Sequence, residues 1–212
     1  MLMADTDKET RAEAASALGR YVELGELEEI SAALHRRVED ALLEKANGED
    51  ELAVRRNALE ALGFSSRPEV VTLIESAFHR ENPDWQASAL FAMGRSSDER
   101  WEEHVLLRLH DVNPVVRLAA VKAAGELRLA SARLLLFEVL EDEDEEDVTT
   151  AAIWSLSQIG GEDARLYIQN LLDLAEEDED VQFLQDALDN LEFTDELNRF
   201  DLMSMDTDVD VE

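Results

Sequence analysis

Small and apolar residues return along this chain at a nearly constant distance. A triplet of this kind occurs at Ala17-Leu18-Gly19, Ala61-Leu62-Gly63, Ala92-Met93-Gly94 and Ala123-Ala124-Gly125, with weaker copies that end at Ser157 and Asp189. The triplet ends are separated by 44, 31, 31, 32 and 32 residues. Such a period predicts a stack of similar units, because one unit of this size cannot bury its apolar faces without a neighbour.

Each unit is predicted to contain two helices. Small or apolar residues stand five and four positions before each triplet end, in the columns Ala14, Ala58, Ala89, Ala120, Ala152 and Ala15, Leu59, Leu90, Val121, Ile153. After the triplet, apolar residues follow at 7, 11, 14 and 15 positions, as at Val70, Ile74, Ala77 and Phe78. This spacing places them on one face of a second helix. Nothing alternates with period two over a useful length, so no sheet is predicted.

Other residues mark the helix starts and the turns. Pro68, Pro83 and Pro114 each suit the first turn of a helix, and the last two follow Asn82 and Asn113, which are predicted N-caps. Turns are predicted at 65–66 and 160–161 within units and at 47–48 between units. Eight positions before the triplet end lies an arginine column, Arg11, Arg55 and Arg117, which Gln86 and Thr149 interrupt.

The predicted fold class is all-α: an α-α superhelix, a right-handed solenoid of about six helix pairs. The units cover approximately 5–48, 49–80, 81–111, 112–144, 145–177 and 178–202. An insertion near residues 26–44 is expected to lengthen the second helix of the first unit. The last unit is degenerate, as a terminal cap should be, with Phe193, Leu197 and Phe200 available to close the core. Residues 203–212 are predicted to form an acidic disordered tail. The sequence leaves open whether the array continues beyond this chain.

These motifs resemble HEAT-like repeats of the short bacterial and archaeal type, which are related to the repeats of phycobilisome bilin lyases. The resemblance is carried by Asn113-Pro114-Val115-Val116-Arg117 with Ala123-Ala124-Gly125, by Val54-Arg55 with the triplet of its unit, and by Val148 with residues 155–160. It extends over about residues 5–200. It implies a helical solenoid, and for most members of this group a binding scaffold, whereas a few members are enzymes.

The enzymatic branches of this group make demands that the sequence does not meet. The hydroxylase branch binds two irons through His-Glu pairs, but the four histidines here are followed by Arg36, Arg80, Val105 and Asp111. No motif requires a tetrapyrrole. Asp206, Asp208 and Asp210 begin like an EF-hand loop, yet Val211 takes the place of the required glycine. We expect no catalytic residue, no metal ligand and no cofactor. The alternative is an enzyme or enzyme subunit of the bilin-lyase-like or metal-dependent type.

Charge changes this picture by excluding some partners. The chain has 51 acidic and 19 basic residues, a net charge of −32, and residues 141–212 alone contain 25 acidic and 2 basic side chains. Phosphate groups repel such a surface, so we expect no binding to nucleic acid or to a membrane. Cysteine is absent, which excludes disulfides and thiolate metal sites. We predict a cytoplasmic scaffold with a protein partner of basic or mixed charge, in an oligomeric state that the sequence does not define.

The acidic residues concentrate in the turns between units, at 49–51, Asp84, Asp111, 141–147 and 176–180. Stacking places these turns along one edge of the array. The predicted contact for a basic partner is the run Glu141, Asp142, Glu143, Asp144, Glu145, Glu146 and Asp147. A solvated edge, or adaptation to salt, is the alternative.

Large apolar residues in otherwise polar columns form a second candidate contact. Phe91 and Trp154 occupy a position where other units have Ser16, Glu60 and Lys122, and Leu106 and Phe137 share another such position. Exposed aromatic residues are enriched at protein interfaces. The same residues would also fill looser packing between units, and the sequence leaves both interpretations open.

Overall fold

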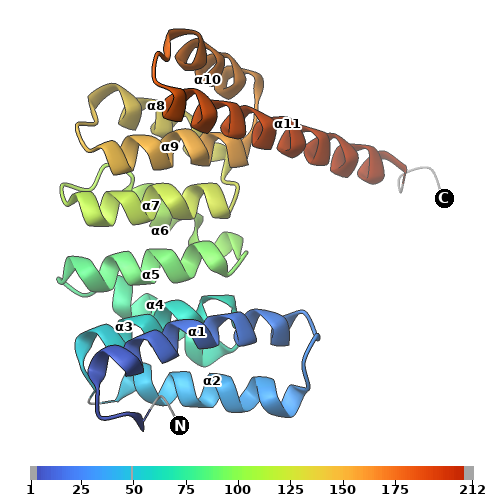
Figure 1. The fold of residues 1–212 in the computed structure, drawn as a ribbon. Helices are drawn as coiled ribbons and strands as arrows, with labels where there is room; N and C mark the ends of the chain where they lie inside the picture. Colours follow the sequence, from blue (N-terminus) through green and yellow to red (C-terminus); the bar gives the residue numbers. More distant parts are fainter. Residues whose placement is uncertain (1–3, 49, 208–212) are drawn as a thin grey trace. The chain divides into compact units, whose positions relative to one another are not determined.

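All secondary structure in the described part of the chain, residues 4–48 and 50–207, is helical in the computed structural model (Figure 1). The α-helices are α1 (Lys8–Glu26), α2 (Ala32–Asn47), α3 (Leu52–Ala61), α4 (Pro68–Phe78), α5 (Pro83–Arg95), α6 (Glu102–Arg108), α7 (Pro114–Glu126), α8 (Arg133–Asp142), α9 (Glu146–Ile159), α10 (Glu162–Leu174) and α11 (Asp178–Thr207). Three 3-10 helices precede α4, α6 and α8: η2 (Leu62–Phe64), η3 (Glu99–Trp101) and η4 (Ala130–Ala132). The all-α fold class is confirmed.

The helices follow one another as the pairs α1–α2, α3–α4, α5–α6, α7–α8 and α9–α10, with the turns between pairs at 48–51, 79–82, 109–113 and 143–145. The sixth unit differs from the expectation, because it is the single 30-residue helix α11 instead of a pair. No proline or glycine occurs between 178 and 207 to end that helix. It continues to Thr207, past residue 203, where the tail is predicted to begin. Residues 208–212 of the predicted tail, like Phe200's side chain, lie outside what the structure describes.

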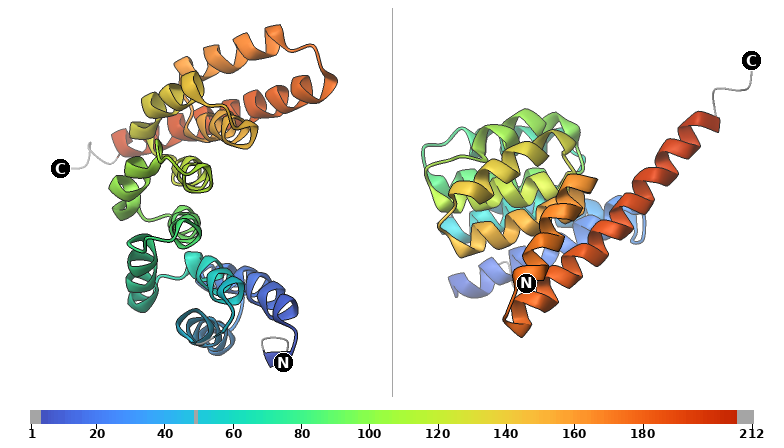
Figure 2. Two further views of the ribbon diagram at one scale, coloured as in Figure 1. Left: turned by 90° about the vertical axis from the view of Figure 1, so that its left-hand side faces the viewer. Right: turned by 90° about the horizontal axis from the view of Figure 1, so that it is seen from above.

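The chain divides into two compact units, Met1–Ala123 and Ala124–Glu212. In the first, α1 packs against α3 and α3 against α5, and these helices form one layer, with α2, α4 and α6 in a second layer (Figure 2). In the second unit, α9 packs against α8, α10 and α11. The insertion in the first repeat, residues 5–48, lengthens both of its helices, since α1 has 19 residues and α2 has 16.

The repeating columns form the core, as their spacing predicts. Fully or almost fully buried members include Ala58, Leu59, Leu90, Ala120, Val121, Ala152 and Leu156. The second-helix face is buried at Val70, Ile74, Ala77 and Phe78, and again at Ala164 and Ile168. In the last unit the triplet ends at Asp189, which is exposed on α11. No described helix therefore covers this side of α11.

Side-chain caps begin several helices. Asp7 accepts a hydrogen bond from the Thr10 amide at 2.7 Å, and Asn82 accepts one from the Trp85 amide at 3.1 Å, which confirms the predicted cap before Pro83. These bonds satisfy amide donors that have no partner within the helix. The turn at Gly160 and Gly161 has φ values of +79° and +110°, a region that favours glycine.

The interrupted arginine column keeps one role through changes of residue type. Each member donates a hydrogen bond to a backbone carbonyl at or near the turn before its helix: Arg11 to Thr6, Arg55 to Ala46, Gln86 to Arg80, Arg117 to Asp111 and Thr149 to Glu145. Glutamine and threonine supply a donor as arginine does, but no positive charge. The column therefore fixes the turns throughout, while its charge disappears toward the C-terminal end.

An ion pair closes the turn between the first two helix pairs. Asp50 lies 2.6 Å from the Arg11 guanidinium and 3.0 Å from the Lys45 ammonium. The hydrogen bond from Arg11, and less so that from Lys45, holds the pKa of Asp50 well below its ordinary value of 3.8. A lowered folded-state pKa gives stability that is complete above the unfolded value, near pH 4, and is lost as the pH falls below it.

We therefore expect Asp50→Asn to lower the free energy of unfolding by about 2 kcal/mol at neutral pH, since it removes charge-assisted bonds from a mostly buried site. Denaturant titrations from pH 7 to pH 3 measure this effect. The difference between wild type and variant should shrink on acidification below about pH 4. A difference that stays constant with pH would contradict an ionised Asp50 as its source.

Candidate functional site

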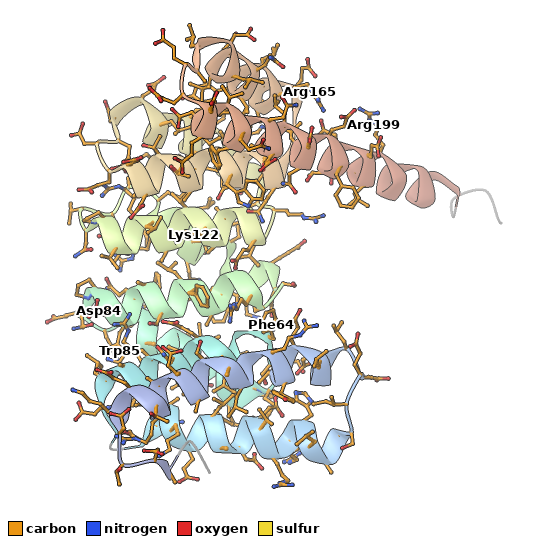
Figure 3. All side chains as sticks on the ribbon, in the orientation of Figure 1. Phe64, Asp84, Trp85, Lys122, Arg165 and Arg199 are labelled. Carbon is orange, nitrogen blue, oxygen red and sulfur yellow. The ribbon has the colours of Figure 1, made fainter. Side chains whose placement is uncertain are left out.

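The edge formed by the turns between helix pairs is compensated by arginine in residues 1–123. Asp50 pairs with Arg11 and Lys45, Asp84 lies 3.3 Å from Arg56, and Asp111 lies 3.0 Å from Arg108. Figure 3 shows Asp84 beside Trp85 at this edge, and Phe64 near the opposite helix ends of the same unit. Glu49, predicted as part of this edge, lies outside the described residues. In this unit the three aspartates of the acidic edge therefore each pair with a basic side chain.

The acidic run, residues 141–147 between α8 and α9, is different. Six of its seven side chains are exposed, Glu143 being half-buried. Among the described residues, none of those six exposed carboxylates has an ion pair. Two arginines of this unit pair with other carboxylates: Arg133 lies 3.0 Å from Asp163, and Arg165 lies 2.8 Å from Asp195. The negative charge of these six carboxylates therefore has no ion-pair partner in the part of the chain that the structure describes.

This contrast has a cause in the repeat itself. In α9 the arginine column holds Thr149, and in α11 the corresponding position is Val181. The turns before these two helices are the ones that carry the acidic run and the exposed residues 176–180. In residues 124–212, the positions that lack the column arginine therefore lie beside the turns that are richest in acidic residues. The run also acts on a neighbour, because burial and the charge of Glu141 raise the pKa of the Tyr167 hydroxyl.

The apolar candidates take part in packing without being fully buried. Phe91 contacts Arg95, whose guanidinium carbon is 4.2 Å from the ring centroid, and Phe137 meets Tyr167 edge-on at 5.3 Å. Leu106 is half-buried on α6. Trp154 is 37% exposed and lies 6.4 Å from the Phe183 ring. Packing accounts for most of the surface of the first three residues, and Trp154 presents the largest free area.

One cluster of titratable side chains has no counterpart among the predicted site residues. Glu26 at the end of α1 meets His35 and Glu39 on α2, and one ligand-type atom from each lies within 4.8 Å of the others. The sequence does carry part of the signal, since His35 and Glu39 are four residues apart and so share a helix face. Glu26 comes from another helix, and only the fold brings it to the pair.

Stacked helix pairs with a period near 31 residues define an α-solenoid of repeated helical hairpins. The family model described as HEAT repeats matches residues 1–94 and 102–192. The chain belongs to the HEAT repeat family.

Solved structures agree with this fold. A chain in the complex of CpcE and CpcF of phycocyanin lyase from Nostoc sp. PCC7120 is 18% identical, with a TM-score of 0.58, over 86% of this chain and 71% of that chain. An engineered protein is 19% identical, with a TM-score of 0.53, over 91% of this chain and 94% of that chain. Identities this low show a shared fold and leave activity open. The comparison with curated proteins gives no match. No described helix combines the length and apolar character needed to cross a membrane.

Proposed function

We propose that this HEAT repeat chain is a non-catalytic scaffold that binds a basic protein segment along the acidic edge of residues 124–212. The observation that carries the proposal is the group of six exposed carboxylates, at 141–142 and 144–147, that have no ion pair among the described residues. In residues 1–123, Asp50 and Asp111 of the corresponding turns pair with arginine or lysine. A surface that needs its charge only for the fold would use such pairs throughout.

Physical chemistry favours a basic protein over other partners. Six exposed carboxylates on one turn attract cationic side chains and speed their encounter, and they repel phosphate groups. Trp154 on the helix that follows the run supplies an exposed aromatic surface of the kind found at interfaces. The proposed contact therefore combines the acidic run with Trp154.

The absence of catalysis is part of the proposal. Its support is the lack of His-Glu pairs and of nucleophile or phosphate-loop motifs in the complete sequence. Family membership supports a binding role, because repeat arrays present extended surfaces on a fold with no required chemistry.

A charge-neutralised variant tests the proposal. Replacing Glu141, Asp142, Asp144, Glu145, Glu146 and Asp147 with Gln or Ser should weaken capture of a protein from a lysate of the native host by at least about tenfold at low salt, because each exposed pair contributes a few tenths of a kcal/mol or more. Raising the salt concentration should weaken capture by wild type and have little effect on the variant. Quantitative mass spectrometry of the bound fraction gives both results.

The matched control removes the same number of charges elsewhere. The control variant replaces six exposed acidic residues within residues 1–123, namely Glu13, Glu28, Glu29, Glu44, Glu75 and Glu81. This control has the net charge of the test variant, so it should bind like wild type if the position of the run matters. Equal loss in both variants would reduce the effect to net charge and refute a specific contact.

A further inference from the structure

We infer that Glu26, His35 and Glu39 form a binding site for one divalent transition-metal ion of the Zn²⁺ class. The site lies within residues 1–123, where the end of α1, the first turns of α2 and the turn between η2 and α4 meet. It is independent of the proposed protein contact, which involves only residues of the other unit.

The spacing of the three side chains fits an ion between them. His35 Nε2 lies 3.6 Å from Glu39 Oε1 and 3.8 Å from Glu26 Oε1. Both distances exceed those of a hydrogen bond. A tetrahedral ion held about 2.1 Å from each ligand would separate the ligand atoms by about 3.4 Å. The two distances from His35 are slightly longer than that, and the two carboxylates lie within 4.8 Å of each other, so binding needs the carboxylates to move inward.

The histidine nitrogen is in a condition that calls for a partner. His35 Nε2 is buried and has no hydrogen-bond partner, although two carboxylates flank it. Buried polar atoms without a partner are rare because each costs desolvation free energy. A metal ion would satisfy Nε2 and both carboxylates at once.

Neighbouring residues hold the two carboxylates in place. Ser65 Oγ donates a hydrogen bond to Glu39 Oε1, and the Ser66 amide donates one to Glu26 Oε1 at 3.0 Å. Outer hydrogen bonds of this kind orient metal ligands and sharpen their affinity. Glu39 is 4% exposed, so its position is fixed by packing as well.

Gly25 makes room for the imidazole. A Cβ atom built on Gly25 would lie 2.2 Å from both Cγ and Cδ2 of His35, closer than any real contact. Only glycine at this position allows the ring to lie against α1 beside Glu26. The His35 ring can lie here only because residue 25 has no side chain. Replacing Gly25 with alanine would therefore displace the ring without deleting a ligand.

The charge around the cluster favours a cation. Arg67 lies 3.8 Å from Glu39, but it also pairs with Asp40 at 2.7 Å and Glu69 at 3.2 Å. Three carboxylates thus share the Arg67 guanidinium, and Glu26 adds a further negative charge to the cluster. Imidazole with carboxylates suits Zn²⁺ and its neighbours better than Mg²⁺ or Ca²⁺, which prefer oxygen ligands alone.

The site has room for a further ligand. Glu26, Ser65 and Ser66 also line a cavity of about 520 Å³. Three protein ligands leave one tetrahedral position, which a water molecule from this cavity would occupy. A bound ion would therefore tie α1 to α2 and at the same time face solvent in the cavity.

Metal titration of the full chain tests the inference. After treatment with a chelator, Zn²⁺ is titrated against a chromophoric competitor in excess Mg²⁺, which occupies the many exposed carboxylates. Wild type should bind one tight equivalent of Zn²⁺, and Co²⁺ in its place should give visible absorption bands. His35→Gln should weaken binding by about a hundredfold, and Gly25→Ala by about tenfold, as expected for loss of a ligand and for its displacement. His79→Gln, an exposed histidine of the same unit, should bind like wild type.

Circular dichroism confirms that each variant is folded before titration. Added Zn²⁺ should raise the melting temperature of wild type and of His79→Gln but not of His35→Gln, because only a folded site binds the ion. Equal Zn²⁺ binding by wild type and His35→Gln would overturn the inference. Unchanged affinity in Gly25→Ala would do the same for the geometry described here.

Discussion

Ile168→Ala is expected to lower the free energy of unfolding by about 2–5 kcal/mol, because it removes a completely buried side chain and leaves a cavity. Ile168 lies on α10, a helix that packs against both α9 and α11. The surrounding backbone belongs to three helices and is held by their mutual contacts, so it has little freedom to collapse into the space. Urea titration followed by circular dichroism measures the change.

Leu166→Ala on the same helix is the matched control. Leu166 is two residues away and 57% exposed, so its truncation should change stability by less than about 0.5 kcal/mol. Both substitutions have similar effects on helix propensity, which leaves burial as the difference between them. Similar losses in the two variants would show that α10 does not bury the face that the repeat assigns to it.

Sequence periodicity predicts this core well because the same contact recurs in every unit. The column from Ala15 to Ile153 is buried throughout. Repetition amplifies a weak pattern until it exceeds the variation of single residues. The prediction is weaker for the last unit: α11 contains no proline or glycine that would end it early, and it continues as one helix to Thr207.

Contacts that occur once are harder to read from sequence. Gln86 and Thr149 look like breaks in an arginine column, yet each still donates to a backbone carbonyl near the preceding turn. The residue type changes at these positions, but the hydrogen bond to the backbone carbonyl is retained. An alignment of the repeats shows only the change of residue type. The cluster of Glu26, His35 and Glu39 is harder still, because it occurs in one unit and joins two helices through their packing.

The acidic edge is a second feature that the sequence predicts only in part. Its location follows from the repeat, but whether each carboxylate has a partner depends on individual side chains. Asp50 and Asp111 look equivalent to the acidic run in sequence, and the structure separates them, since they pair with cations. Counting charge therefore overestimates the exposed acidity of residues 1–123.

The last large effect is expected where backbones of successive units touch. Gly63→Ala should lower the free energy of unfolding by about 1–3 kcal/mol through overpacking. A Cβ atom at Gly63 would lie 2.9 Å from both Cα and O of Ala92 on α5, which are backbone atoms and cannot rotate away. The helices must separate, and contacts beside them weaken.

Gly19→Ala, at the same position of the preceding unit, is the control for this effect. Its added Cβ would meet the Ala61 Cα at 3.2 Å, a tight contact that a small shift relieves, and alanine favours the interior of α1 by about 1 kcal/mol over glycine. Gly19→Ala should therefore stay within about 1 kcal/mol of wild type. Thermal and urea unfolding of the two variants measure the difference. If Gly63→Ala proves as stable as Gly19→Ala, the approach of η2 to α5 is looser than these distances require, and glycine in the triplet is a matter of sequence history more than of packing.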